Sequence, residues 1–108
     1  MPEFDRDLKK LSKRFRSLEQ DIEVLKKVLS VMPEAAPPRS FRIAGTHSGT
    51  PIIKVKKFAC KSLKGSGENS GIRAIYAYCQ ERCEIKFLEI YFKGDKELED
   101  KNRFKLDK

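Results

Sequence analysis

The chain has 108 residues, 39% of them hydrophobic, a length that suits one domain (residues 1–108) with a single modest core. Its 24 Lys and Arg outnumber its 16 Asp and Glu, and the net charge of +8 favours a polyanionic partner. No apolar run reaches the roughly 18 residues of a membrane span, so no membrane partner is expected. Three cysteines at spacings that fit no disulfide framework, and a polar, acidic start, predict a cytoplasmic protein.

Two amphipathic helices are expected at the start of the chain. Between residues 3 and 15 the apolar positions recur at helical spacing: Phe4, Leu8, Leu11 and Phe15. Ser17 and Gln20 have the spacing of a capping box, in which each side chain satisfies a backbone N–H near the other, so a second helix should begin there. Pro33 ends this helix after Met32, because the residue before a proline avoids the helical conformation. We expect the two helices to form an antiparallel hairpin.

The remainder of the chain predicts an antiparallel sheet. Residues 33–51 contain four prolines and two glycines and should form a mobile connection without regular structure. Strand-forming residues then dominate 52–62, 72–79 and 84–92, and the last two segments are joined by a short polar hairpin. Residues 96–108 have the composition of a short helix. The expected fold is therefore α+β, with a helix hairpin on one face of a twisted antiparallel sheet of three to four strands. The other face should be concave, basic and exposed.

Five of the excess positive charges fall within residues 54–67. This segment has no acidic residue, and its lysines are Lys54, Lys56, Lys57, Lys61 and Lys64. Nothing local neutralises their field, which favours an anion-binding surface. The competing interpretation is an edge strand whose lysines discourage aggregation.

Arg73 is the strongest single candidate for a phosphate contact. It lies two residues after Gly71, where a glycine turn permits close approach and a guanidinium can meet a phosphate through two parallel hydrogen bonds. Alternatively, Arg73 is a surface residue paired with a carboxylate such as Glu89 on the neighbouring strand. Tyr91, near the end of the last strand, is a candidate proton donor, although strand tyrosines more often pack in a core. Lys93 follows it and is a candidate for neutralising phosphate charge.

No metal or cofactor is expected. His47 is the single histidine, which excludes an enzyme that needs two imidazoles as acid and base. Cys60, Cys79 and Cys83 include no C-x-x-C pair, so ordinary thiols are favoured over a zinc site. The common nucleotide and hydrolase motifs do not occur in the sequence.

Four segments together resemble the RelE/ParE toxin superfamily: FDRDLKKL at 4–11, KVK at 54–56, GIRAIYAY at 71–78 and EIYFK at 89–93. The resemblance implies a RelE-like domain that cuts mRNA in the ribosomal decoding site and is held in check by a cognate antitoxin protein. It assigns Arg73 to the conserved sheet arginine of the family, and Lys54 and Lys56 to its basic strand pair. The family's opening strand and its C-terminal catalytic tyrosine or histidine have no clear counterpart. Tyr91 and Lys93 lie nearest to the latter, and Arg103 is a weaker candidate.

The resulting hypothesis is a metal-independent endoribonuclease. The 2′-hydroxyl of the RNA attacks the adjacent phosphate, and Arg73 with Lys54 or Lys56 stabilises the charge that builds on the phosphoryl oxygens. Tyr91 or Lys93 assists departure of the 5′ oxygen, and Lys57, Lys61 and Lys64 bind RNA. The alternatives are a ParE-like toxin that acts on DNA gyrase without nuclease activity, and a non-catalytic RNA-binding module.

Overall fold

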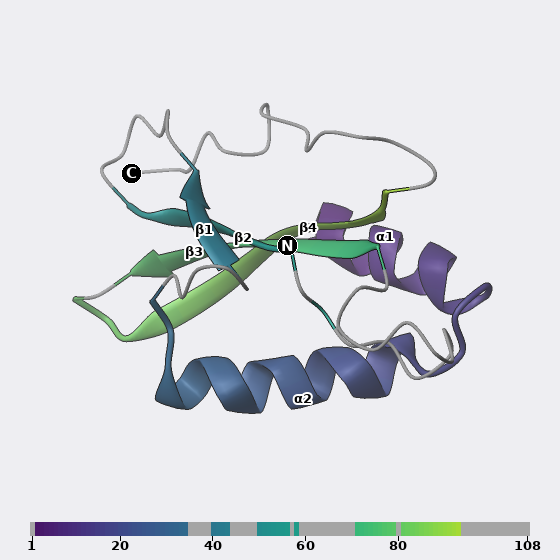
Figure 1. The fold of residues 1–108 in the computed structure, drawn as a ribbon, viewed down its shortest axis with the longest axis horizontal. Coiled ribbons are helices and arrows are strands. Elements are labelled where there is room, and N and C mark those ends of the chain that lie inside the picture. Colours follow the sequence, from purple (N-terminus) through teal and green to yellow (C-terminus); the bar gives the residue numbers. More distant parts are fainter. Residues whose placement is uncertain are drawn as a thin grey trace.

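Two helices are followed by a four-stranded sheet in the computed structural model, which describes residues 2–34, 40–43, 50–56, 58, 71–79 and 81–93 (Figure 1). The elements are α1 (Pro2–Ser12), α2 (Leu18–Val31), β1 (Ser40–Ile43), β2 (Ile52–Val55), β3 (Ile72–Cys79) and β4 (Glu84–Phe92). The predicted α+β class and the N-terminal helix pair are confirmed. The predicted C-terminal helix at 96–108 lies outside the described residues. Within the described part of the chain, no helix is long and apolar enough to cross a bilayer.

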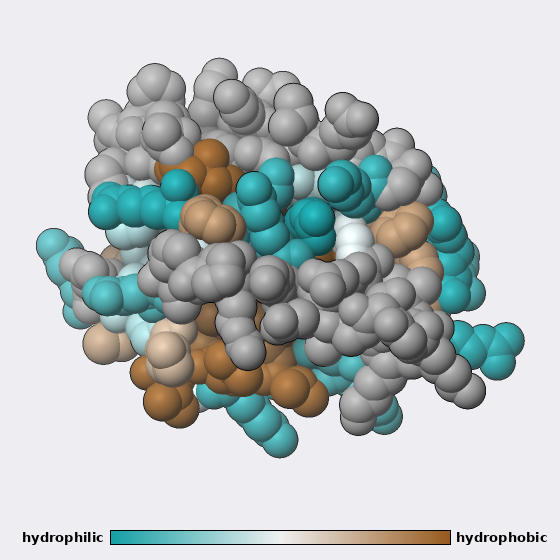
Figure 2. All heavy atoms as spheres, viewed as in Figure 1, coloured by the Kyte–Doolittle hydropathy of each residue, from teal (hydrophilic) through white to brown (hydrophobic). Residues whose placement is uncertain are grey.

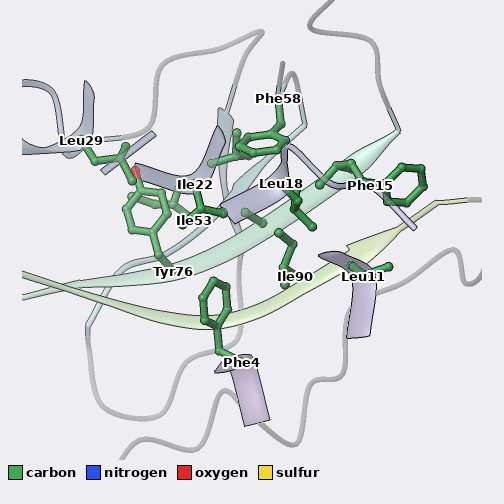
Figure 3. Close-up of a cluster of buried hydrophobic side chains, with 13 residues drawn as sticks. Phe4, Leu11, Phe15, Leu18, Ile22, Leu29, Ile53, Phe58, Tyr76 and Ile90 are labelled. Atoms are coloured by element: carbon green, nitrogen blue, oxygen red, sulfur yellow. The ribbon is translucent and has the colours of Figure 1, made fainter. Parts of the chain in front are cut away.

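Both helices cover the same face of the sheet, as their apolar stripes predict. The buried cluster on this side joins Phe4, Leu11, Phe15, Leu18, Ile22 and Leu29 of the helical region to Ile53, Tyr76, Ile90 and other strand residues (Figure 3). The Phe4 ring stacks on Phe87 of β4 with centroids 5.1 Å apart, which docks α1 onto that strand. Burial of these side chains supplies the main force that holds the layers together.

The predicted capping box at the start of α2 is wrong. Ser17 occupies the right-handed helical region (φ −81°, ψ −6°) and makes no side-chain cap to the backbone. Its hydroxyl instead donates to Oδ2 of Asp21, 2.7 Å away and one turn along. An N-cap residue normally has an extended backbone, and this geometry is not available at Ser17.

Several apolar side chains of α2 and its C-cap are exposed to solvent. Val24, Val28, Val31 and Met32 are all more than half exposed. In Figure 2 hydrophobic residues gather along the lower edge, where Figure 1 places α2. Because these side chains are exposed, they contribute little to the core, even though α2 itself packs on the sheet.

The strands form an antiparallel meander in the order β1-β2-β3-β4. The prediction that residues 33–51 lack regular structure is wrong at 40–43, where β1 pairs along the whole of β2. β2 ends at Val55, short of the predicted 52–62, although Phe58 makes an isolated bridge. The predicted strands at 72–79 and 84–92 are confirmed as β3 and β4.

One irregularity interrupts the ladder between β3 and β4. Tyr76 pairs with Phe87, whereas Ile75 pairs with Glu89, so Leu88 is an extra residue in β4. Such a β-bulge bends its strand and changes which face the following side chains occupy.

Both faces of the sheet carry buried apolar side chains. A second cluster lies on the side away from the helices and consists of Ile52, Ile75, Ala77, Leu88 and Tyr91, with Ile43 packed against it. The expectation of an exposed second face is therefore wrong for this apolar cluster, although Lys56 on the same side is exposed and Lys54 and Arg73 are partly exposed. Consecutive apolar residues such as Ile52 and Ile53 are typical of strands covered on both sides.

Tyr76 ties the end of α2 to the sheet. Its side chain is fully buried, and its hydroxyl donates to the carbonyl oxygen of Pro33, 2.6 Å away. Burial disfavours the charged phenolate and raises the pKa of Tyr76 to about 12. The folded chain therefore keeps this proton to a higher pH than the unfolded chain, where the pKa is near 10.0.

Tyr76→Phe should lower the free energy of unfolding by about 1–2 kcal/mol at neutral pH, because the part-buried carbonyl of Pro33 loses its donor. The stability linked to Tyr76 is complete below pH 10.0 and is lost as pH rises through about 12, so the variant should lose less stability over that interval. Urea unfolding followed by circular dichroism at several pH values measures both effects. Tyr78→Phe, on the same strand and half-buried, is the control. If the free energy of unfolding fell equally with rising pH in wild type and in Tyr76→Phe, the raised pKa of Tyr76 would be contradicted.

Candidate nucleic-acid interface

The basic residues of the predicted site share the sheet face opposite the helices. Side chains alternate along a strand, and Ile53 and Val55 of β2 belong to the helix-side core. Lys54, between them, therefore lies on the other face. The same argument places Arg73 there, because Ile72 and Ala74 face the helices.

Strand register brings the candidate residues into two neighbouring rows across this face. In the first row Lys54 lies opposite Phe41 on β1 and opposite Ile75 on β3, which in turn faces Glu89. In the second row Arg73 lies opposite Tyr91. Lys54, Arg73 and Tyr91, which are far apart in the chain, are thus brought together.

Arg73 is held by backbone. Its Nη1 donates to the carbonyl oxygen of Lys56 at 2.7 Å and more weakly to that of Ile72 at 3.5 Å. Both of its hydrogen bonds to described residues therefore end on neutral acceptors. The alternative interpretation, an ion pair between Arg73 and Glu89, is therefore wrong. The Glu89 carboxylate does not pair with the Arg73 guanidinium. The side chain is partly exposed, so an anion can reach it.

Each of the two lysines lies over an aromatic ring. Lys54 Nζ is 5.8 Å from the centroid of Tyr91, and Lys56 Nζ is 5.0 Å from the centroid of Phe41. These cation–π contacts hold the two ammonium groups near the rings. Lys56 is exposed and Lys54 is partly exposed. The edge-strand interpretation is weakened, because β2 is an inner strand between β1 and β3.

The two C-terminal candidates differ in access. Tyr91 is only 5% exposed and belongs to the second apolar cluster. Lys93 is exposed just beyond β4, and its backbone N–H donates to the carbonyl of Gly71, 2.8 Å away. Gly71 has a φ of +86°, and a Cβ there would lie 3.2 Å from the Phe92 ring, so position 71 needs glycine.

Glu89 belongs to this face, although sequence reasoning considered it only as a partner for Arg73. Its side chain is fully buried in the row that contains Lys54. Burying a carboxylate is costly unless other groups compensate its charge. Glu89 places one acidic side chain in the row that contains Lys54. Its spacing of two residues from Tyr91 is the sequence signal that places both on one face.

Several sequence candidates cannot be located. Lys57, Lys61, Lys64, His47, Cys60 and Arg103 lie outside the described residues. Among the described residues, no group of three or more His, Cys, Asp or Glu side chains is arranged to hold a metal ion.

Cys79 lies at the end of β3, beside the turn to β4. Nε of Arg82 donates to its Sγ at 3.5 Å, and this contact lowers the pKa of Cys79 because it stabilises the thiolate. Cys83, in the turn itself, is exposed with a φ of 51°.

In a protein that retains Cys79 but carries Cys60→Ser and Cys83→Ser, Arg82→Ala should slow alkylation by iodoacetamide at pH 7 by roughly threefold or more. The thiolate is the reactive form, and its fraction falls when the guanidinium is removed. Mass spectrometry of the modified protein measures the rate, and Arg16→Ala on the helical side is the control. An unchanged rate would show that Arg82 does not activate the thiol.

A separate groove of about 450 Å³ lies on the helical side between α1, α2 and β4. Its walls include Phe4 and Leu29, which belong to the helix-side core, together with Lys26 and Lys86. The groove contains none of the residues that form the two rows, so it is not part of the candidate interface.

The described residues define an α+β domain with two helices on one sheet face and the cationic side chains of Lys54, Lys56 and Arg73 on the other. No family model, curated protein or solved structure matches the chain. A function is therefore proposed from the chemistry of this cationic face and from the four sequence segments that resemble the toxin superfamily.

Proposed function

We propose that this protein is a RelE-type toxin, a metal-independent endoribonuclease that cleaves mRNA. The observation that carries the proposal is the placement of Lys54, Lys56 and Arg73 on one sheet face, with the Arg73 guanidinium oriented by the Lys56 carbonyl. Three adjacent cations, one of them a pre-oriented guanidinium, match the charge of an RNA phosphate.

In the proposed reaction the 2′ oxygen attacks the neighbouring phosphorus. The new P–O2′ bond forms as the P–O5′ bond breaks, which leaves a 2′,3′-cyclic phosphate and a 5′ hydroxyl. Arg73 and Lys54 or Lys56 stabilise the charge on the phosphoryl oxygens, and a water molecule carries away the 2′ proton. Lys93 is better placed than Tyr91 to give a proton to the 5′ oxygen, because Lys93 is exposed and Tyr91 is 5% exposed.

The proposed partners are mRNA on the ribosome and a cognate antitoxin in the cytoplasm. An antitoxin that blocks the phosphate site needs an acidic segment to cover the cationic face, since like charges would repel. Lys57, Lys61 and Lys64 follow Lys56 in the chain and extend the proposed RNA contact.

The test is mRNA cleavage in a translation reaction with purified ribosomes, followed by primer extension to map the cut sites. The purified protein should also cleave free RNA in EDTA, because the proposed reaction needs no metal ion. Cleavage in EDTA supports the metal-independent mechanism. A protein that leaves RNA intact but blocks DNA supercoiling by gyrase would instead be a ParE-like toxin.

Binding of single-stranded RNA should weaken steeply with salt. Four phosphate contacts, made by Lys54, Lys56, Arg73 and Lys93, imply a slope of log K against log [salt] of roughly −3, because each contact releases a counterion. Lys56→Gln should make the slope less steep by about 0.7. Fluorescence anisotropy with a 2′-O-methyl oligonucleotide, which cannot be cleaved, measures this slope. Lys27→Gln, on the exposed side of α2, should leave it unchanged, and a wild-type slope near zero would exclude this face as the docking surface.

A further inference from the structure

Phe41 is an exposed aromatic residue on the edge strand of the sheet. It is 36% exposed, whereas the other described aromatic side chains are buried or half-buried. Single exposed hydrophobic residues are common in folded proteins, so exposure alone carries no functional meaning. The evidence for a function of Phe41 comes from the two lysines next to it.

Phe41 belongs to the cationic face. It lies directly opposite Lys54, and residues opposite each other in a ladder project from the same side of the sheet. The Nζ of Lys56 is 5.0 Å from its ring centroid. Its counterpart on β4, Tyr91, is also accompanied by a lysine but is 5% exposed and has little surface to offer.

A partly exposed aromatic ring that is accompanied by lysines, one of them over the ring, is an arrangement that can bind single-stranded nucleic acid without reading its sequence. The base stacks on the ring, and the neighbouring lysines contact the phosphates on either side of it. A double-stranded helix cannot use such a platform, because its bases are already stacked on one another. The residue therefore favours an unpaired strand.

We propose that Phe41 is a base-stacking platform for single-stranded RNA and that Lys56 contacts the adjoining phosphate. This inference rests on the proposed function and deepens it, since it assigns a base-binding position next to the phosphate site at Arg73. The stacked nucleotide lies on the β1 side of that site, and its base is recognised by its flat face.

The test uses 2′-O-methyl oligoadenylate as an uncleavable probe. Phe41→Leu should weaken binding roughly 5- to 100-fold, the range expected for loss of one stacked base, whereas Phe41→Tyr should stay within about threefold of wild type. Val28→Ala, at a similarly exposed apolar position on α2, is the matched control and should bind as wild type. Circular dichroism should show that all variants are folded.

A second measurement does not depend on affinity. The chain has no tryptophan, so Phe41→Trp introduces a single indole fluorophore, and Val31→Trp on α2 does the same away from the site. Stacked adenine should quench the indole fluorescence of the Phe41→Trp variant and leave that of the Val31→Trp variant unchanged.

The outcomes separate this inference from the proposed function. Salt-dependent RNA binding by wild type, with equal affinity for Phe41→Leu and no quenching in Phe41→Trp, overturns the stacking platform and leaves the RNA-binding face in place. Loss of affinity and quenching without any RNA cleavage support the platform and overturn the nuclease. A wild-type protein that binds no RNA overturns both.

Discussion

Arg73→Ala should reduce the rate of mRNA cleavage by at least about 100-fold, while RNA binding falls much less. The guanidinium is held by the Lys56 carbonyl at 2.7 Å, so it is oriented before the phosphate gains charge in the transition state. Arg73→Lys should recover only part of the loss, because one ammonium group cannot make the two-pronged contact of a guanidinium. Single-turnover cleavage and anisotropy, measured on the same preparations, separate the effect on the reaction from the effect on binding.

Arg42→Ala is the matched control for this substitution. Arg42 is an exposed arginine on β1. It lies opposite Ile53, which belongs to the helix-side core, so Arg42 is on the face of the sheet away from Arg73. The variant should cleave RNA at the wild-type rate. Equal rates for wild type and Arg73→Ala would remove Arg73 from the site, even if the protein proves to be a nuclease.

Ile22→Ala should lower the free energy of unfolding by about 2–5 kcal/mol, a large part of the stability of a small domain. Ile22 is 1% exposed in α2 and packs in the helix-side core, so the substitution removes buried apolar surface and leaves a cavity (Figure 3). The midpoint of urea unfolding measures the loss. Val24→Ala, two residues away and 53% exposed, should change stability by less than about 0.5 kcal/mol. Similar losses in both variants would mean that α2 does not dock on the sheet through this side.

The helices and the two long strands could be predicted because local signals agree with the tertiary structure. The spacing of Phe4, Leu11 and Phe15 produces one buried stripe, and Pro33 lies just beyond the end of α2. The capping box failed for a local reason. The Ser17 hydroxyl can accept from a backbone N–H of the first helical turn or donate to the Asp21 carboxylate. Because the backbone of Ser17 is helical rather than extended, it donates to Asp21.

β1 could not be predicted because its stability comes from pairing. Residues 40–43 are four amino acids in a proline-rich connection, too short to show a reliable alternation. They become a strand because β2 offers an unpaired edge that they match along its full length. Strand formation of this kind depends on tertiary context more than on intrinsic preference.

The candidate site was predictable in part. Alternation along each strand places Lys54 and Arg73 on defined faces, but the offset between strands decides which residues become neighbours. That offset depends on the pairing of β1 with β2, which brings Phe41 beside Lys54, and on the pairing of β2 with β3. The burial of Tyr91 also depends on the second apolar cluster, which composition alone does not reveal.

The extra residue in β4 reverses the odd–even parity of that strand. Before Leu88, the odd-numbered Ile85 and Phe87 face the helices, whereas beyond it the even-numbered Ile90 does so. Uninterrupted alternation would send Tyr91 into the helix-side core and place Ile90 on the face that carries Lys54 and Arg73. One inserted position therefore lets a single strand dock α1 with its first half and place Glu89 and Tyr91 beside the cationic residues with its second.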